Sequence, residues 1–328
     1  MSAGWDVRHG KGLWLPQASW WLDAQARQTR SFVTHAHGDH IARHREIVCT
    51  RATARFLRAR IPGKRLVHEW NFGETHPLEF GLRATLHPAG HILGSAQVLL
   101  EGDHGSLLYT GDFKLRPSLA AEPCATPRAD TLIMETTFGL PRYVFPPEAE
   151  VVAQIIAFCQ QAIADGATPV LLCYSLGKSQ EVLRALAPAG LPVMLHPETA
   201  RLTQVYEQLG VVFPPWRELT VRDVAGHIVL CPPHSASVLG DLPSVRKAAI
   251  TGWALDSSAI YRMRCHAAFP LSDHADYPDL LRFVEQVQPK RVLTLHGFAR
   301  EFAQTLRARG LDALALGHGN QLEFSLSP

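Results

Sequence analysis

One short stretch constrains the fold of this 328-residue chain more than any other. The hexapeptide HAHGDH, residues 35–40, directly follows residues 31–34, a run with high β-propensity. Three imidazoles and one carboxylate so close together are typical of a metal site, because zinc, manganese and iron share these ligands. In an extended backbone His35 and His37 point to one side, and Gly38 lets the chain turn sharply after them. The alternative interpretation is a solvated, histidine-rich surface loop.

Further acidic and histidine residues follow other predicted strands. They are His91, Asp112, Glu135, His274 and His296. Each one alone would more often be a solvated turn residue than a ligand. All of them lie at the carboxyl ends of predicted strands, where open α/β sheets place their binding sites. Their shared position therefore predicts that they converge with the hexapeptide on one site.

The alternation of strand-like and helical apolar patterns predicts the α/β class. The pattern changes character near residue 140, where a loop rich in proline precedes a helical pattern over 151–164. From there to about residue 265, strands and helices alternate as in an open parallel sheet. We therefore expect a main domain in two parts, residues 1–139 and 266–328, and an inserted domain over 140–265.

Composition excludes several classes of protein. Hydrophobic residues make up 46% and charged residues 19% of the chain, which excludes a disordered or fibrous protein. No apolar run approaches the ~18 residues of a membrane helix, and the start lacks a signal-peptide pattern, so we expect a cytoplasmic protein without membrane association. The six cysteines show no CxxC spacing and are expected to be reduced. The net charge of +2 does not by itself indicate nucleic-acid binding.

The motifs resemble those of a known family. The sequences HAHGDH (35–40), AGH (89–91) and YTGDF (109–113) resemble the metal-binding signature of the metallo-β-lactamase fold. The sequences METTFG (134–139), SDHADY (272–277) and LTLHG (293–297) resemble the added motifs of the β-CASP nucleases, which cleave DNA or RNA. The resemblance covers almost the whole chain and is greatest to the bacterial ligase-associated DNA exonucleases. It implies an αββα sandwich with an inserted Rossmann-like β-CASP domain.

The resemblance also implies roles for individual residues. It implies two divalent ions, Zn²⁺ or Mn²⁺. The first ion would be bound by His35, His37 and His91, and the second by Asp39, His40 and His296. Asp112 would bridge the two ions. The implied catalytic residues are Asp39, Glu135 and His274, with Glu135 orienting His274 and His274 giving a proton to the leaving 3′-oxygen. Asp273 departs from the pattern of relatives, and we expect it to face water.

Contacts to nucleic acid are predicted in the inserted domain. The candidates are Ser175, Lys178, His234, Ser235 and Trp253. Ser175 and Lys178 lie in a strand-to-helix loop that suits a phosphate, although an ordinary helix cap explains Ser175 equally well. The GKS sequence there is not a P-loop, because Leu172 occupies the position of its first glycine. Trp253 suits either base stacking or the core.

The function implied is a two-metal nuclease acting on single-stranded DNA or RNA. The resemblance favours a 5′-to-3′ exonuclease of DNA repair or RNA processing that leaves a 5′-phosphate and a 3′-hydroxyl. It also implies a DNA ligase or helicase as partner, and we expect a monomer or weak dimer. A lactonase or thioesterase is the main alternative, but it needs no second domain. Two others are a di-iron protein, whose relatives carry Glu at the position of His37, and a non-enzymatic clamp with a decayed site.

Overall fold

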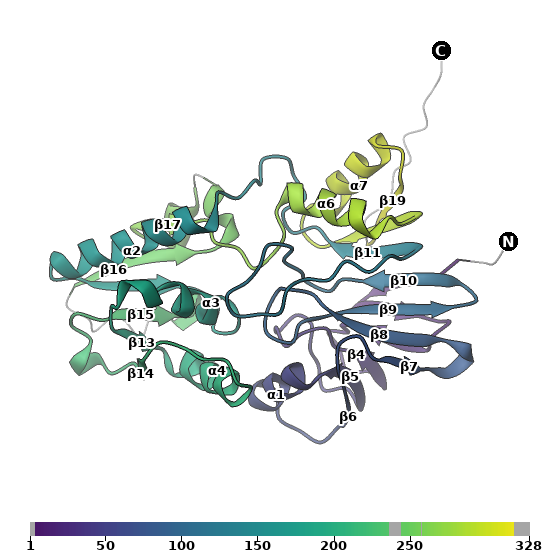
Figure 1. Cartoon of the computed structure of the whole chain (residues 1–328), viewed down its shortest axis with the longest axis horizontal. Coiled ribbons are helices and arrows are strands. Elements are labelled where there is room, and N and C mark those ends of the chain that lie inside the picture. Colours follow the sequence, from purple (N-terminus) through teal and green to yellow (C-terminus); the bar gives the residue numbers. More distant parts are fainter. Residues whose placement is uncertain (1–3, 236–243, 257, 318–328) are drawn as a thin grey trace, which may run out of the picture.

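The computed structural model describes residues 4–235, 244–256 and 258–317. Figure 1 shows two lobes side by side. We call them the body, which holds two sheets and both ends of the chain, and the insert, which holds the third sheet. Among the helices of the described residues, none combines the length and apolar character that crossing a membrane requires.

The body is a sandwich of two sheets. The first sheet contains, in spatial order, β1 (Arg8–Gly10), β2 (Gly12–Leu15), β3 (Trp20–Leu22), β4 (Arg30–Phe32), β5 (Glu46–Thr50) and β6 (Leu66–Trp70). The second contains β19 (Asp312–Ala315), β18 (Arg291–Leu295), β11 (Thr131–Glu135), β10 (Gly105–Tyr109), β9 (Ala96–Gly102), β8 (Arg83–Pro88) and β7 (Thr75–Pro77). Apolar side chains of both sheets, such as Phe32 and Val98, pack into one core between them.

Helices cover the outer faces of this sandwich. On the second sheet lie α6 (Tyr277–Val287) and α7 (Ala299–Ala308), which bury Phe283 and Phe302 in one cluster with residues of β10, β11 and β18. On the first sheet lies α1 (Arg51–Arg60), whose Phe56 packs with residues of β5. These layers form the predicted αββα arrangement, and the predicted fold class is confirmed.

The insert is built on a parallel sheet. Its strands, in spatial order, are β14 (Trp216–Glu218), β13 (Val193–Leu195), β15 (Ile228–Cys231), β12 (Thr168–Leu172), β16 (Val245–Ile250) and β17 (Ala267–Phe269). Its helices are α2 (Glu148–Ala164), α3 (Lys178–Ala185), α4 (Pro197–Gln208) and the short α5 (Ala259–Met263). Since β17 pairs with β16, the sheet continues past residue 265, and we propose Phe269 as the end of the inserted domain.

The topology brings distant segments to one edge of the body. Strands β10, β11 and β18 are parallel neighbours, so their carboxyl ends lie together. The backbone N–H of Ala96 donates to the carbonyl of Thr34 at 2.9 Å, which ties the segment after β4 to the second sheet at the same edge. This edge of the body faces the insert (Figure 1). Glu135 ends β11, and His91, Asp112 and His296 follow β8, β10 and β18.

Candidate metal and catalytic centre

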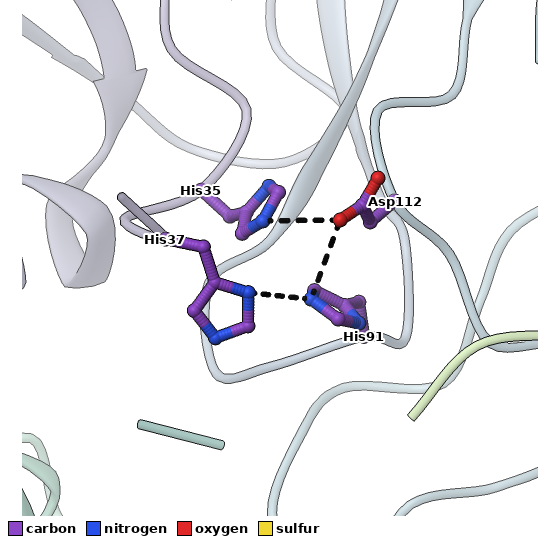
Figure 2. A group of neighbouring side chains, drawn as sticks. All are labelled: His35, His37, His91 and Asp112. Atoms are coloured by element: carbon purple, nitrogen blue, oxygen red, sulfur yellow. Dashed lines mark hydrogen bonds and ion pairs between the residues drawn. The ribbon is translucent and has the colours of Figure 1, made fainter. Parts of the chain in front are cut away.

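Four predicted ligands form a compact cluster. His35 and His37 follow β4, His91 follows β8, and Asp112 follows β10 (Figure 2). The Nε2 atom of His91 lies 3.0 Å from Nδ1 of His37 and 3.9 Å from Oδ2 of Asp112. The same Asp112 oxygen lies 3.5 Å from Nε2 of His35. Donor atoms that share one ion at about 2.0–2.1 Å are separated by roughly this much, so the cluster suits a single cation.

Four histidine rings of the site each have one nitrogen fixed by a hydrogen bond. The four contacts are His35 Nδ1 to Thr34 Oγ1 (3.0 Å), His37 Nε2 to the Leu176 carbonyl (3.0 Å), His91 Nδ1 to the Asp273 carbonyl (2.7 Å) and His40 Nδ1 to Asp23 Oδ2 (2.9 Å). Such contacts select the tautomer and orient the ring, which is the usual arrangement behind metal-binding histidines. The remaining nitrogen of each ring is left to face the cluster.

The donors present fit a divalent metal. Nε2 of His35 is buried and has no hydrogen-bond partner in the described part of the chain. Burial lowers the pKa of His35 well below its usual value and lowers the pKa of His37 to about 4, so both rings are neutral near pH 7. A buried, neutral imidazole nitrogen without a partner offers a free lone pair, which a metal ion would satisfy.

A second group of predicted ligands adjoins the first across Asp112. Nε2 of His40 lies 3.3 Å from Oδ2 of Asp112 and 3.8 Å from Oδ2 of Asp39. Burial lowers the pKa of His40, but Asp112 and Asp23 outweigh this effect and raise it well above its usual value. The carboxylates of Asp112 and Asp23 therefore favour a positive charge beside them. A protonated His40 ring supplies that charge without metal, and a second cation would supply it when bound.

His296 lies near His40 of this second group. Its ring centroid lies 5.9 Å from that of His40. The backbone of His296 is left-handed (φ 61°), as is that of Gly297 after it (φ 55°), and a Cβ on Gly297 would lie 2.5 Å from Thr137 Cα. Glycine is therefore required in the turn that presents His296 after β18.

The predicted ligands other than His35 and His91 line one cavity of about 450 Å³, which we call the central cavity. Residues from both lobes line it, among them Thr137 and Asp273 of the body segments and Ser175 and Leu176 of the insert. Arg60, at the end of α1, also lines it and donates to the Ala36 carbonyl at 2.8 Å. Arg60 was not among the predicted site residues.

Asp23 is a further buried residue that the sequence did not single out. Its carboxylate accepts from the backbone N–H and hydroxyl of Thr34 (2.8 and 2.6 Å), from His40 (2.9 Å) and from the hydroxyl of Tyr109 (2.9 Å). Asp23 thus fixes Thr34 and His40, at the two ends of the histidine loop, through hydrogen bonds. Its position directly after β3, like that of the other site residues after their strands, is the signal that could have identified it.

Glu135 and His274 form the predicted pair. Nδ1 of His274 lies 2.8 Å from Oε1 of Glu135, which ends β11 and is buried. The other Glu135 oxygen accepts from the backbone N–H of Thr137 at 2.9 Å. Burial lowers the pKa of His274, but the Glu135 carboxylate outweighs burial and raises the pKa to about 10. Neighbouring cations would lower this pKa toward neutrality, which leaves His274 suited to donate a proton.

Two expectations in this region need correction. Lys178 is buried, and its ammonium lies 3.5 Å from Glu181 and 3.5 Å from Asp273, so we no longer expect it to contact phosphate. Asp273 does not face water, since it is buried beside Lys178. Burial raises the pKa of Asp273, but Lys178 outweighs it and the pKa falls below its usual value.

The other predicted nucleic-acid contacts differ in their positions. Ser175 and His234 line the central cavity, and both contact Glu198, at 2.8 and 3.2 Å. Trp253 does not line that cavity, but packs against Phe138 with ring centroids 4.8 Å apart. The backbone N–H of Ser235 closes a turn onto the Pro232 carbonyl. All four remain predictions.

Comparison with known proteins agrees with this geometry. Residues 260–316 match the family model described as a Zn-dependent metallo-hydrolase RNA specificity domain. The chain is 61% identical over 325 residues to a probable DNA ligase of Opitutus terrae, covering 98% of this chain and 32% of that protein. It is 29% identical over 311 residues to the 5′ exonuclease Apollo of Rattus norvegicus (87% and 54% covered). It is 24% identical over 296 residues to the DNA cross-link repair 1A protein of Mus musculus (81% and 28% covered). The chain therefore spans 28–54% of the length of these relatives.

Proposed function

Because the chain belongs to the β-CASP group of the metallo-β-lactamase family, we propose that it is a metal-dependent nuclease that hydrolyses phosphodiester bonds of single-stranded DNA or RNA. One observation carries this proposal. His37 and Asp112 of the cluster line the central cavity together with His274, whose Nδ1 is held by Glu135, so an acid stands beside the ligands that would bind metal. The relatives named for 5′ exonuclease action and DNA cross-link repair favour DNA and attack from the 5′ end.

The insert supports a nuclease over a lactonase or thioesterase. The carbonyl of Leu176, in the loop before α3, accepts the hydrogen bond that orients His37. Ser175 and His234 of the insert also line the central cavity. A small substrate needs no such second wall, whereas a strand can be held between two lobes. The aligned relative named a probable DNA ligase supports a ligase partner, and a helicase partner stays a prediction.

The donor set and the family description agree on a divalent metal. In the proposed arrangement His35, His37 and His91 would hold one ion, and Asp112 would contribute to both this position and a second one. Asp39, His40 and His296 complete the second position. A pair of Zn²⁺ or Mn²⁺ ions would supply a reactive hydroxide at neutral pH and charge stabilisation for the phosphate oxygens.

The residues of the chain then have separate tasks. Thr34 and Asp23 hold His35 and His40 in the orientation that turns their free nitrogens inward. His274 keeps a proton because its Nδ1 is held by the buried Glu135, and it gives that proton to the leaving 3′-oxygen. A 5′-phosphate and a 3′-hydroxyl are the expected products.

The test is a time course with single strands of DNA and RNA, each labelled at the 5′ or the 3′ end, with Zn²⁺ and with Mn²⁺. Mononucleotides released from the 5′ end are the expected result. Thioester and lactone substrates serve as the comparison. Hydrolysis of those compounds without cleavage of any strand, under either metal, would replace the nuclease by the alternative enzyme.

Replacing Asp112 by alanine is expected to remove at least one metal equivalent from the purified protein. Asp112 Oδ2 lies within 3.3–3.9 Å of nitrogens of His40, His35 and His91, so no other described carboxylate contacts as many of the proposed ligands. Elemental analysis measures the loss. Asp103→Ala, at an exposed hairpin residue, is the control and should retain all metal. Full occupancy in Asp112→Ala would contradict the bridging role.

A further inference from the structure

A second cavity of about 540 Å³ lies beside the central cavity, within the insert. We call it the insert pocket. The residues that define its chemistry are Tyr174, His234, Lys247, Trp253, Arg262 and Arg264. Tyr174 and His234 also line the central cavity, so the two cavities share a wall. The two cavities therefore adjoin at these two side chains.

The place of the insert pocket in the fold is that of a ligand site. Tyr174, His234 and Trp253 follow the carboxyl ends of β12, β15 and β16, which are parallel neighbours. Lys247 lies within β16, and Arg264 follows α5. The chain leaves β12 through α3 toward β13 on one side of the sheet, while β16, on the other side of β12, continues to β17. In open α/β sheets, ligands bind in the crevice at this reversal of strand order.

The charges around the insert pocket favour an anion. Lys247, Arg262 and Arg264 line it, and no carboxylate does among the described residues. Arg262 is paired with Asp256 at 3.2 Å. Neither Lys247 nor Arg264 forms an ion pair with a carboxylate in residues 4–235, 244–256 and 258–317. Two cations that line one cavity and have no carboxylate partner among the described residues suit phosphate oxygens.

Two aromatic side chains add a surface for a base. The Tyr174 side chain is 60% exposed and stands where the two cavities meet. Trp253 is held rigidly, because its ring packs against Phe138 of the body, with centroids 4.8 Å apart, and against Tyr143 at 5.7 Å. Exposed aromatic faces stack on any base, so they bind a strand without selecting its sequence.

Resting on the nuclease function proposed above, we propose that the insert pocket binds one nucleotide of the substrate strand, next to the phosphate that lies at the metal centre. Lys247 and Arg264 contact its phosphate, and Tyr174 or Trp253 stacks on its base. The ligand chemistry is a phosphate joined to an aromatic base. A free mononucleotide offers the same groups, so the experiment distinguishes the two sources.

The test measures binding of a fluorescent single-stranded oligonucleotide by anisotropy, in EDTA, as a function of salt. The double variant Lys247→Ala/Arg264→Ala is expected to weaken binding on the order of tenfold. The slope of log Kd against log salt should fall by about 0.7 for each phosphate that the variant no longer neutralises. Arg300→Ala, at an exposed residue of α7 on the body, is the matched control and should change neither quantity.

Three outcomes have distinct meanings. Unchanged Kd and salt slope in the double variant, with wild-type thermal stability, would overturn the pocket assignment. Loss of mononucleotide binding alone, with strand affinity unchanged, would also overturn it, in favour of a free nucleotide. The binding assay contains no metal, so it does not depend on cleavage. If the strand binds through Lys247 and Arg264 but is not cleaved after metal is added back, the result contradicts the nuclease function and leaves the pocket assignment intact.

Discussion

Replacing His274 by alanine is expected to slow strand cleavage by roughly 10²–10⁴-fold, the usual contribution of a positioned acid, without loss of bound metal. The reason lies in its contact with Glu135, since the buried carboxylate 2.8 Å away keeps the ring protonated. The measurement is a single-turnover rate together with metal content. His227→Ala, a histidine that lines neither the central cavity nor the insert pocket, is the control.

The companion variant Glu135→Gln separates the acid from a structural role. It keeps the size of the side chain but removes the charge that raises the pKa of His274. The pKa of His274 should therefore fall, and the loss of activity at high pH should begin at a lower pH than in the wild type. Wild-type rates in His274→Ala at full metal occupancy, or an unshifted pH profile in Glu135→Gln, would remove the pair from the mechanism.

Replacing Glu181 by alanine is expected to destabilise the protein by roughly 3–5 kcal/mol, because two buried lysines lose the carboxylate that lies between them. The Glu181 carboxylate is buried between Lys114, at 2.6 Å, and Lys178, at 3.5 Å. Burial lowers the pKa of Lys114, but Glu181 and Glu148 outweigh it and keep the pKa raised, so the lysine remains charged. Guanidinium unfolding measures the effect.

The control for this prediction is Glu150→Ala, on the exposed face of α2, where surface substitutions change stability by less than about 0.5 kcal/mol. Lys114 belongs to the body, whereas Glu148 and Glu181 belong to the insert, so the ion pairs connect the lobes. A loss no larger than that of the control would mean that the buried pairs add nothing to the free energy of unfolding.

The fold class and the convergence of the histidine and aspartate side chains were predictable because their signals are local. Ligand spacing in HAHGDH depends only on neighbouring residues, and His91, Asp112 and Glu135 each directly follow or end a strand. Parallel strands carry such residues to one edge whatever the details of the packing. The same reasoning could have included Asp23, which also follows a strand but occurs without other ligand types nearby.

The roles of Lys178 and Asp273 could not be predicted in this way. The GKS sequence at the start of α3 resembles a phosphate-binding loop, but this end of the helix lies against the body, where Lys178 contacts Asp273. Ion pairs between residues far apart in the chain leave no local pattern. The proximity of Lys247 and Arg264 could not be predicted for the same reason, because it depends on how β16 and α5 pack around the insert pocket.

The hydrogen bond from His37 to the Leu176 carbonyl makes the orientation of a ring in the body depend on the insert. A body without the insert would keep all seven proposed ligands, but His37 would lose the hydrogen bond that orients its ring. Substitutions that tilt α3 are therefore expected to change the affinity of the proposed site for metal, although they replace none of the proposed ligands.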